Sequence, residues 1–315
     1  MRFGFYLPTR GPMANRDDLA RFAGAGDKSG FDSVMIADHI AFPVEIESKY
    51  PYTVDGSFPG HGDSLEQLAL MSFIAGVTER LRLVTSVMIL PHRNPIVTAK
   101  ALATVDVLSE GRVTVGVGVG WLLEEFEALN APDFDRRGAV SNEYLEIFKT
   151  LWTQSPAEFT GDFYSFRSLR FEPAPVQKPH PPIWIGGHSK PALRRVARYG
   201  DGWHPVGAIA AVPLAPEEMS AKLDELKSLT DAEGRDFDAI AITFKAPLYD
   251  TAIPDVGGKR RPFSGSPEQI VEDIGAYAAV GISELIFDFR AETIDASVER
   301  LDRFAREIMP LARGI

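Results

Sequence analysis

Segments rich in β-branched and aromatic residues alternate along this chain of 315 residues with amphipathic segments, and this alternation restricts the fold to the α/β class. We predict strands at 2–7, 33–37, 82–90, 113–118, 183–185, 202–204, 238–246 and 284–289. We predict helices at about 16–29, 64–79, 95–109, 142–153, 190–199, 216–233, 267–280 and 295–309. Eight strand–helix pairs are typical of a (β/α)8 TIM barrel. A doubly wound sheet shares the alternation, and the count of eight favours the barrel.

Several helices carry start signals. Asp63 or Ser64 precedes an apolar run, and Ser64 followed by Gln67 resembles a capping box, which places a helix start there. Ser266 before Pro267 marks a second start, and Pro216 a third, because proline suits the first helical turn.

Glycine and proline are scattered through loops, and no linker, repeat or low-complexity segment divides the chain. We therefore predict one domain, 1–315, with insertions in the loops after strands 2, 4 and 7, at 38–63, 119–141 and 247–266. In a TIM barrel the loops after strands form the active face. The long stretch 154–182 precedes a strand and belongs to the opposite face.

Charge and cysteine content exclude several classes of function. With 33 basic and 44 acidic residues the net charge is −11, which disfavours nucleic acid and anionic membranes as partners. The absence of cysteine excludes disulfides, thiolate catalysis and cysteine-ligated metal. With no signal peptide or membrane span recognisable, we expect a cytoplasmic protein with a small-molecule substrate, and a homodimer stays open.

A histidine stands at the end of the second predicted strand, in VMIADHI. His39 and its neighbour Asp38 would therefore lie on the active face. Histidine is the side chain whose unperturbed pKa lies nearest neutrality, which suits acid–base catalysis. The alternative is a histidine that only holds its loop by bonding the backbone.

The stretch GGHSKP, from Gly186 to Pro191, joins a strand to a helix. Two glycines let the backbone approach a ligand, and a helix N-terminus with Ser189 offers donors to an anion such as phosphate. The alternative is a tight turn with an N-cap.

The run GVGVG at 116–120 lacks the third glycine of a dinucleotide fingerprint. Its glycines would instead leave room for a flat ligand, with Trp121 beside that ligand. Trp121 could also be a loop anchor. Glu124 and Glu125 open a short helix, and we retain Glu124 as a candidate site residue.

The sequence shows no motif for metal binding or for a serine nucleophile. The six histidines form no HxH or HExxH pair, so we predict no metal, and no GxSxG elbow is present. The basic stretch Lys259-Arg260-Arg261 is either a solvated loop or a contact to an anionic substrate or cofactor tail.

The stretch PVQKPHPPIWIGGHSKPALRRVARYGDGW (175–203), with SGFDSVMIADH (29–39) and TSVMILPHRNPIVTAKALATVDVLSEGRVTVGVGVGW (85–121), resembles the bacterial luciferase-like flavin and deazaflavin oxidoreductases. These are barrel enzymes, and the resemblance covers nearly the whole chain in the family's order. The chain looks most like the members that use coenzyme F420, a deazaflavin.

The resemblance implies roles around the cofactor ring. His39 matches the histidine facing the reactive edge of the ring, and Asp38 belongs to the same wall. Ser86 and Val87 match a bulge where the family has a non-proline cis peptide backing the ring.

Further cofactor contacts implied by the resemblance come from backbone segments: Gly118, Val119 and Gly120 at the other ring edge, and Gly186, Gly187, His188 and Ser189 at the phosphate. One position departs from the pattern. Sugar-phosphate dehydrogenases of the superfamily have a glutamate where this chain has Trp121, so that substrate and that acid are not implied here, and whether Glu124 replaces the acid is open.

The resemblance therefore implies an F420-dependent oxidoreductase that transfers a hydride to or from a small organic substrate, such as a ketone, alcohol or unsaturated ring. The acidic tail of F420 would suit the basic stretch at 259–261. One alternative is an FMN-dependent monooxygenase on the same barrel. Another is a catalytically silent flavin- or deazaflavin-binding protein.

Overall fold

A closed parallel barrel forms the centre of the protein in the computed structural model, which describes residues 1–60, 63–249 and 260–315. The strands run in the order β3-β2-β1-β11-β10-β9-β8-β5-β4, and pairing between β3 and β5 closes the ring. Their bounds are β1 Arg2–Tyr6, β2 Ser33–Ile36, β3 Arg82–Thr85, β4 Met88–Ile89, β5 Val113–Gly118, β8 Ile183–Gly186, β9 Gly202–His204, β10 Ala241–Leu248 and β11 Glu284–Asp288. The predicted α/β TIM barrel is confirmed.

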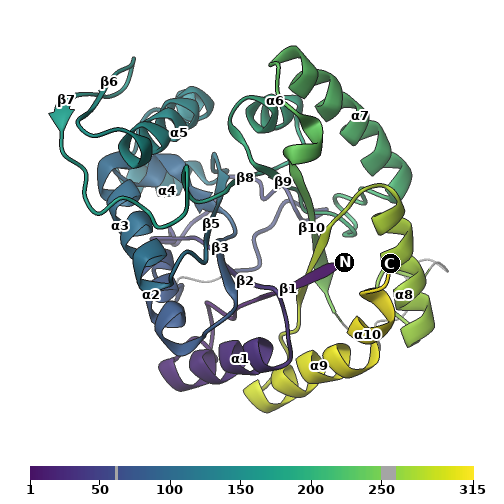
Figure 1. Cartoon of the computed structure of the whole chain (residues 1–315). Coiled ribbons are helices and arrows are strands. Elements are labelled where there is room, and N and C mark those ends of the chain that lie inside the picture. Colours follow the sequence, from purple (N-terminus) through teal and green to yellow (C-terminus); the bar gives the residue numbers. More distant parts are fainter. Residues whose placement is uncertain (61–62, 250–259) are drawn as a thin grey trace.

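Helices surround the barrel (Figure 1). The eight predicted helices appear as α1 Arg16–Lys28, α2 Gln67–Val77, α3 Pro95–Leu108, α5 Arg137–Thr153, α6 Lys190–Tyr199, α7 Pro216–Ala232, α8 Pro267–Ala279 and α9 Ile294–Glu307. The short helix expected at Glu124 and Glu125 is present as α4 Leu123–Ala128. A second short helix, α10 Met309–Ala312, was not predicted, and 3-10 turns lie at Leu90–His92, Phe134–Arg136 and Phe237–Ala239. None of the helices among the described residues is both long and apolar enough to traverse a lipid bilayer.

The third barrel strand is interrupted. It consists of β3 and β4, and the peptide bond between Ser86 and Val87 in the gap is cis. This confirms the cis bond implied by the family resemblance. The interruption lies near the end of the strand, where the chain turns toward the active face.

Side chains along β1 alternate between two cores. Phe3 packs edge-on against Phe304 of α9 at 5.4 Å between ring centroids, and Phe5 against Phe22 of α1 at 5.4 Å, so odd residues face the helices. Tyr6 faces inward, where it packs on a cluster of Met35, Val84, Trp184 and Ile286. The period-two pattern of a strand thus separates an outer core from a filled barrel interior.

A buried carboxylate lies at the N-terminal end of the barrel. Glu284 is fully buried and accepts a hydrogen bond from Ser33 Oγ at 2.5 Å and another from Arg82. Arg82 also stacks over the Trp184 ring at 4.8 Å, and Arg2 approaches Glu284 at 3.6 Å. A buried charge needs such partners, and here they seal the face opposite the predicted site.

Some boundaries differ from prediction. Glu66, rather than Ser64, caps α2, because its carboxylate accepts from Ala69 N while Gln67 turns inward to donate to the Ile36 carbonyl at 2.7 Å. The capping box at Ser266 is present as predicted. The stretch 154–182 contains an antiparallel hairpin, β6 Ala157–Thr160 and β7 Ser165–Leu169, that the periodicity did not reveal.

Candidate active site

His39 follows β2 and is held by a carboxylate from another part of the chain. Its Nδ1 lies 2.9 Å from Glu125 Oε2, and Glu125 comes from α4, in the loop region after β5. The other carboxylate oxygen of Glu125 accepts the backbone N–H groups of Ile40 at 2.8 Å and Ala41 at 3.2 Å. Both the ring and the loop that carries it are therefore fixed by Glu125.

Glu125 is fully buried, whereas the side chain of His39 is 14% exposed. Burial acts to raise the pKa of the Glu125 carboxyl, but the hydrogen bond and charge of His39 and the N–H of Ile40 outweigh it and leave that pKa below its usual value. The carboxylate is thus ionised at neutral pH. It orients Nδ1 of His39, while Nε2 makes no hydrogen bond with any described residue and is the atom left to exchange a proton.

Glu124, the carboxylate selected from the sequence, has different neighbours. Its Oε1 accepts the backbone N–H groups of Glu47 at 2.6 Å and Ser48 at 2.9 Å. Burial acts to raise the pKa of Glu124, yet hydrogen bonds from Ser48 and Glu47 lower it to about 2. Glu124 anchors the loop after β2, and the catalytic role predicted for it has no support in these contacts. The helical turn moves the adjacent Glu125 toward His39, which sequence spacing alone did not reveal.

Asp38 does not point at an open site. Its two oxygens accept a bidentate pair from Arg93 at 2.7 and 2.8 Å, and Oδ2 also accepts the N–H of Ile89 at 2.9 Å. Arg93 reaches Glu66 as well, at 2.8 Å. Asp38 therefore ties β4 to the end of β2 and holds the residues just after Val87 in place, while its place in the wall beside a cofactor ring stays a prediction.

Ser86 belongs to a buried chain of hydrogen bonds across the barrel. Its Oγ lies 3.1 Å from Tyr6 Oη and 3.1 Å from His204 Nε2, and His204 Nδ1 lies 2.6 Å from Thr243 Oγ1. Burial, with repulsion from Arg82, lowers the pKa of His204 to about 3, so its ring is neutral.

The direction of this chain follows from its far end. Thr243 donates to the Trp203 carbonyl at 3.2 Å, so it accepts from His204 Nδ1–H. The neutral ring then accepts at Nε2 from Ser86, and Ser86 accepts from Tyr6. Every member is satisfied, which fixes the Ser86 side chain beneath the cis bond.

The glycines of the fourth and fifth barrel strands make room for Val87. A Cβ at Gly118 would lie 2.7 Å from Val87 Cγ2, and one at Gly186 would lie 3.1 Å from Val87 Cγ1. Gly120 has φ +89°, and a Cβ there would lie 2.6 Å from the Phe126 ring. These glycines therefore allow close packing of Val87 and Phe126, and the room that they would leave for a flat ligand stays a prediction. Val119, between two of them, is partly exposed.

The loop before α6 has the features of an anion site. Gly187 has φ +86°, and its carbonyl accepts from Trp203 Nε1 at 2.7 Å, which fixes the turn. Ser189 caps the helix by accepting from Ala192 N. His188 Nδ1 is buried without a partner, and the backbone N–H groups of His188 and Ser189 donate to no described residue. Unpaired donors at a helix start fit a phosphate group.

An aromatic cluster covers His39 and consists of Phe42, Tyr50, Phe58 and Trp121. Phe42 lies 4.3 Å from the His39 ring centroid, and Phe58 lies 5.4 Å from it. Trp121 contacts Tyr50 at 5.0 Å and Phe58 at 5.2 Å. Trp121 is thus part of an apolar wall beside the histidine, and three of the four rings come from the long loop after β2.

The basic stretch predicted to meet a cofactor tail is only partly described. Lys259 lies outside the described residues. Arg260 donates to Asp273 of α8 at 2.6 and 2.7 Å and to the Ser264 carbonyl at 2.8 Å. Arg260 is therefore engaged within the fold, and the argument from this stretch for an acidic cofactor tail is weakened.

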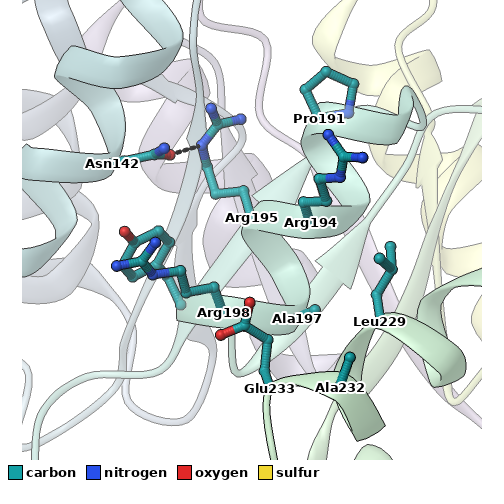
Figure 2. A pocket seen from close by; sticks show the side chains of 10 residues that line it. Asn142, Pro191, Arg194, Arg195, Ala197, Arg198, Leu229, Ala232 and Glu233 are labelled. Atoms are coloured by element: carbon teal, nitrogen blue, oxygen red, sulfur yellow. Dashed lines mark hydrogen bonds between the residues drawn. The ribbon is translucent and has the colours of Figure 1, made fainter.

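The hollow drawn in Figure 2 lies among α5, α6 and α7, on the outside of the barrel. Its volume is about 340 Å³, and arginines 194, 195 and 198 line it. The buried Arg195 is bound to Asn142 at 2.7 Å and to the Gly138 carbonyl. This hollow is separate from the barrel mouth. Among residues 1–60, 63–249 and 260–315, no group of three or more acidic or histidine side chains could hold a metal ion.

Comparison with known sequences decides the family. A sequence model described as luciferase-like monooxygenase matches residues 1–252. The chain belongs to this luciferase-like family. The resemblance predicted from the 175–203 stretch is thereby confirmed, and the barrel, cis bond and strand-tip histidine are its structural counterparts.

The proteins similar to this chain include two whose names state different cofactors. The uncharacterized protein Rv0940c of Mycobacterium tuberculosis is 33% identical over 278 residues, 84% of this chain and 88% of that protein. The FMNH2-dependent dimethylsulfone monooxygenase of Pseudomonas putida is 26% identical over 305 residues, 81% of each. An F420-dependent secondary alcohol dehydrogenase solved with an F420–acetone adduct superimposes with a TM-score of 0.76 at 18% identity, over 99% of both chains.

Proposed function

We propose that this protein is an F420-dependent oxidoreductase that transfers a hydride between the deazaflavin and a small organic substrate, such as a secondary alcohol or its ketone. The observation that carries the proposal is the His39–Glu125 pair at the barrel mouth, whose Nδ1 and carboxylate lie 2.9 Å apart. The F420-dependent dehydrogenase of the same fold supports the choice of cofactor.

The proposed chemistry needs an acid–base group on the protein. Oxidising an alcohol removes a hydride from carbon and a proton from oxygen, and forms the C=O bond. The cofactor, when bound, supplies the hydride acceptor. His39 Nε2 takes the hydroxyl proton, and ionised Glu125 stabilises the resulting imidazolium, because the negative charge lies at Nδ1. In the ketone direction the same nitrogen returns the proton.

The remaining residues bind and orient the cofactor. The loop of Gly186, Gly187, His188 and Ser189 holds the phosphate through backbone donors, which suits a chain of net charge −11. The Ser86–Val87 segment, fixed by Tyr6 and by His204, backs the ring. The aromatic cluster excludes water from the reacting atoms and favours an apolar substrate.

Titration of the purified protein with F420 and with FMN, followed by anaerobic turnover, tests the proposal. We expect F420 to bind and its absorbance to change when a panel of secondary alcohols is added, with no need for oxygen. Binding of F420 without turnover of any alcohol, ketone or unsaturated ring would favour a silent binding protein. Tight FMN binding with no affinity for F420 would overturn the cofactor assignment.

An FMN-dependent monooxygenase is the second candidate. The observations that favour it are the relative in Pseudomonas putida and the engagement of Arg260 with Asp273, which weakens one argument for F420. The phosphate loop and ring walls fit either cofactor. This candidate predicts that one molecule of oxygen is consumed for each molecule of reduced FMN and each molecule of substrate. The F420 reaction, by contrast, proceeds equally well without oxygen.

A further inference from the structure

Lys245 is a cation on the inner face of the barrel. It lies in β10, whose side chains alternate: Phe244 packs outward on Tyr277 of α8 at 4.7 Å, while Thr243 points inward to His204. Lys245 shares the inward face of Thr243, two residues closer to the active face. Its Nζ lies 5.2 Å from the centre of the Tyr6 ring.

Lys245 has no acidic partner among the described residues, and its Nζ makes no hydrogen bond there. Four titratable side chains lie on or beside the flanking strands: His204 on β9, Glu284 and Asp288 at the two ends of β11, and Tyr6 beyond β11 on β1. Glu284 is bound by Ser33 and Arg82 at the opposite end of the barrel. His204 is neutral, Asp288 is bound to Arg290 at 2.8 Å, and Tyr6 offers only its ring face. A lysine directed into a barrel without a counter-ion is costly, because burial penalises its charge. Burial lowers the pKa of Lys245 to about 7.

The barrel mouth divides into two arcs. The cofactor arc consists of the ends of β4, β5 and β8, with Val87, Gly118 to Gly120 and the phosphate loop. The substrate arc consists of the ends of β10, β11, β1 and β2, where Lys245, Tyr6 and His39 stand. Lys245 and His39 thus share the arc that the proposed cofactor leaves to the substrate. Lys245 is only partly buried, so part of the residue is open to solvent.

A second cation on the substrate arc points to the same chemistry. Arg10, in the loop after β1, lies over the Phe58 ring at 5.2 Å, and its buried Nη1 has no hydrogen-bond partner within the described part of the chain. Burial, with repulsion from Arg290, lowers the pKa of Arg10. Lys245 and Arg10 therefore both lie on the substrate arc, and neither forms an ion pair with an acidic side chain of the described residues. An apolar ring bearing a negative charge would satisfy both features at once.

We propose that Lys245 binds the carboxylate of an aromatic acid, and that the substrates of this protein are aromatic acids that also carry the alcohol or ketone group on which the proposed hydride transfer acts. The proposal rests on the proposed function, since it places the cofactor on the opposite arc. The aromatic cluster packs on the ring of the substrate, and the charge pair with Lys245 sets its orientation relative to His39.

Calorimetric titration of the purified full chain with benzoate, benzamide and acetate tests the proposal, with no cofactor added and again with saturating F420 or FMN. Benzoate and benzamide differ in charge and share a ring. We expect benzoate to bind about tenfold to a hundredfold more tightly than benzamide, because a hydrogen bond between charged groups is lost in the amide. Acetate lacks the ring and should bind more weakly than benzoate.

Lys245→Met removes the cation and should abolish the preference for benzoate over benzamide. The matched control is Lys100→Met on α3, whose lysine also lies over an aromatic ring, that of Phe171 at 3.9 Å. The control should keep the preference. Lys245→Gln serves as a second variant should the methionine perturb folding, and it is expected to lose the preference as well.

Proton uptake supplies an independent readout. At pH 8 most Lys245 amines are neutral, so binding of benzoate should take up as much as one proton per site, and at pH 6 it should take up none. Titrations in buffers of different ionisation enthalpy measure this quantity. If the proton uptake persists in Lys245→Met, another group such as His39 takes up the proton, and the assignment of the anion site to Lys245 is overturned.

Three further results would overturn the proposal: equal affinity for benzoate and benzamide, equal affinity for acetate and benzoate, or a loss of F420 or FMN affinity in Lys245→Met with unchanged benzoate binding. The last result would make Lys245 a cofactor ligand. A chain that binds neither cofactor but prefers benzoate would contradict the proposed function and leave the anion site standing. The two claims therefore fail separately.

Discussion

The cofactor arc and the substrate arc are built by different means. On the cofactor arc, glycines and backbone N–H groups dominate, and the chain approaches itself closely around Val87. On the substrate arc, long side chains from separated segments meet, such as His39 with Glu125, 86 positions apart in the chain. A backbone of this geometry can bind a phosphate and a flat ring whichever substrate the protein uses. Side chains can change one at a time, so the substrate arc is where specificity can vary while the cofactor site is kept.

The strongest test of this contrast is His39→Ala. We expect the turnover number to fall about 10²- to 10⁴-fold, because an acid–base group is lost, while cofactor affinity changes little. Stopped-flow absorbance of the cofactor measures the first quantity, and equilibrium titration the second. If the mutant turns over at the wild-type rate, His39 is only a loop anchor. If the mutant instead loses cofactor affinity, His39 belongs to the cofactor site and the division into two arcs is wrong.

Glu125→Gln separates positioning from proton transfer. The amide can still accept from Ile40 but cannot stabilise a charged His39, so we expect a loss of turnover smaller than that of His39→Ala. We also expect about 1–3 kcal/mol less stability at neutral pH, since a buried group is left imperfectly paired. Chemical denaturation measures it, and Glu127→Gln, an exposed glutamate on the same helix, is the control.

The pH dependence of that difference has a definite sign. The pKa of Glu125 is lowered in the folded state, so its contribution to stability is present above the ordinary value of 4.5 and is lost as pH falls below it. The difference in the free energy of unfolding between the wild type and Glu125→Gln should therefore become smaller below pH 4.5. If this difference stays constant down to pH 3, the charge on Glu125 does not contribute to the stability of the protein.

The local structure of the cofactor arc could be predicted from the sequence better than the side-chain contacts of the substrate arc, and the reason is physical. Gly187 and Ser189 are adjacent to the helix they serve, so their roles can be inferred from local spacing. The eight strands and His39 at a strand tip follow from the same kind of local pattern. Glu125 reaches His39 only because α4 turns it inward, and the sequence offers no sign that distinguishes it from Glu124. In the sequence Lys245 is one polar residue within a strand, and only the closed barrel shows that its side chain faces the interior.

On the cofactor arc, Gly118→Ala tests the close packing of Val87. The added Cβ would lie 2.7 Å from Val87 Cγ2, so we expect a loss of about 1–3 kcal/mol in the free energy of unfolding. Gly24→Ala in α1 is the control, because nothing lies within 4 Å of the Cβ there, and it should gain about 0.5–1 kcal/mol. Equal effects of the two substitutions would show that Val87 can move aside and that the cofactor arc is less rigid than its packing suggests.

The smallest expected effect comes from Ser189→Ala. Loss of the N-cap should cost about 1 kcal/mol of stability, and Ser266→Ala, which removes the cap of α8 far from the phosphate loop, should cost about the same. The two caps differ in what else they do. If the loop holds the cofactor phosphate, Ser189→Ala also weakens cofactor binding, by about tenfold for a hydroxyl donor to a charged group, whereas Ser266→Ala leaves it unchanged. Equilibrium titration of both variants with F420 and with FMN measures this. Two variants with the same stability loss and the same cofactor affinity would show that Ser189 is only a cap, and the anion would then be held, if at all, by backbone N–H groups alone.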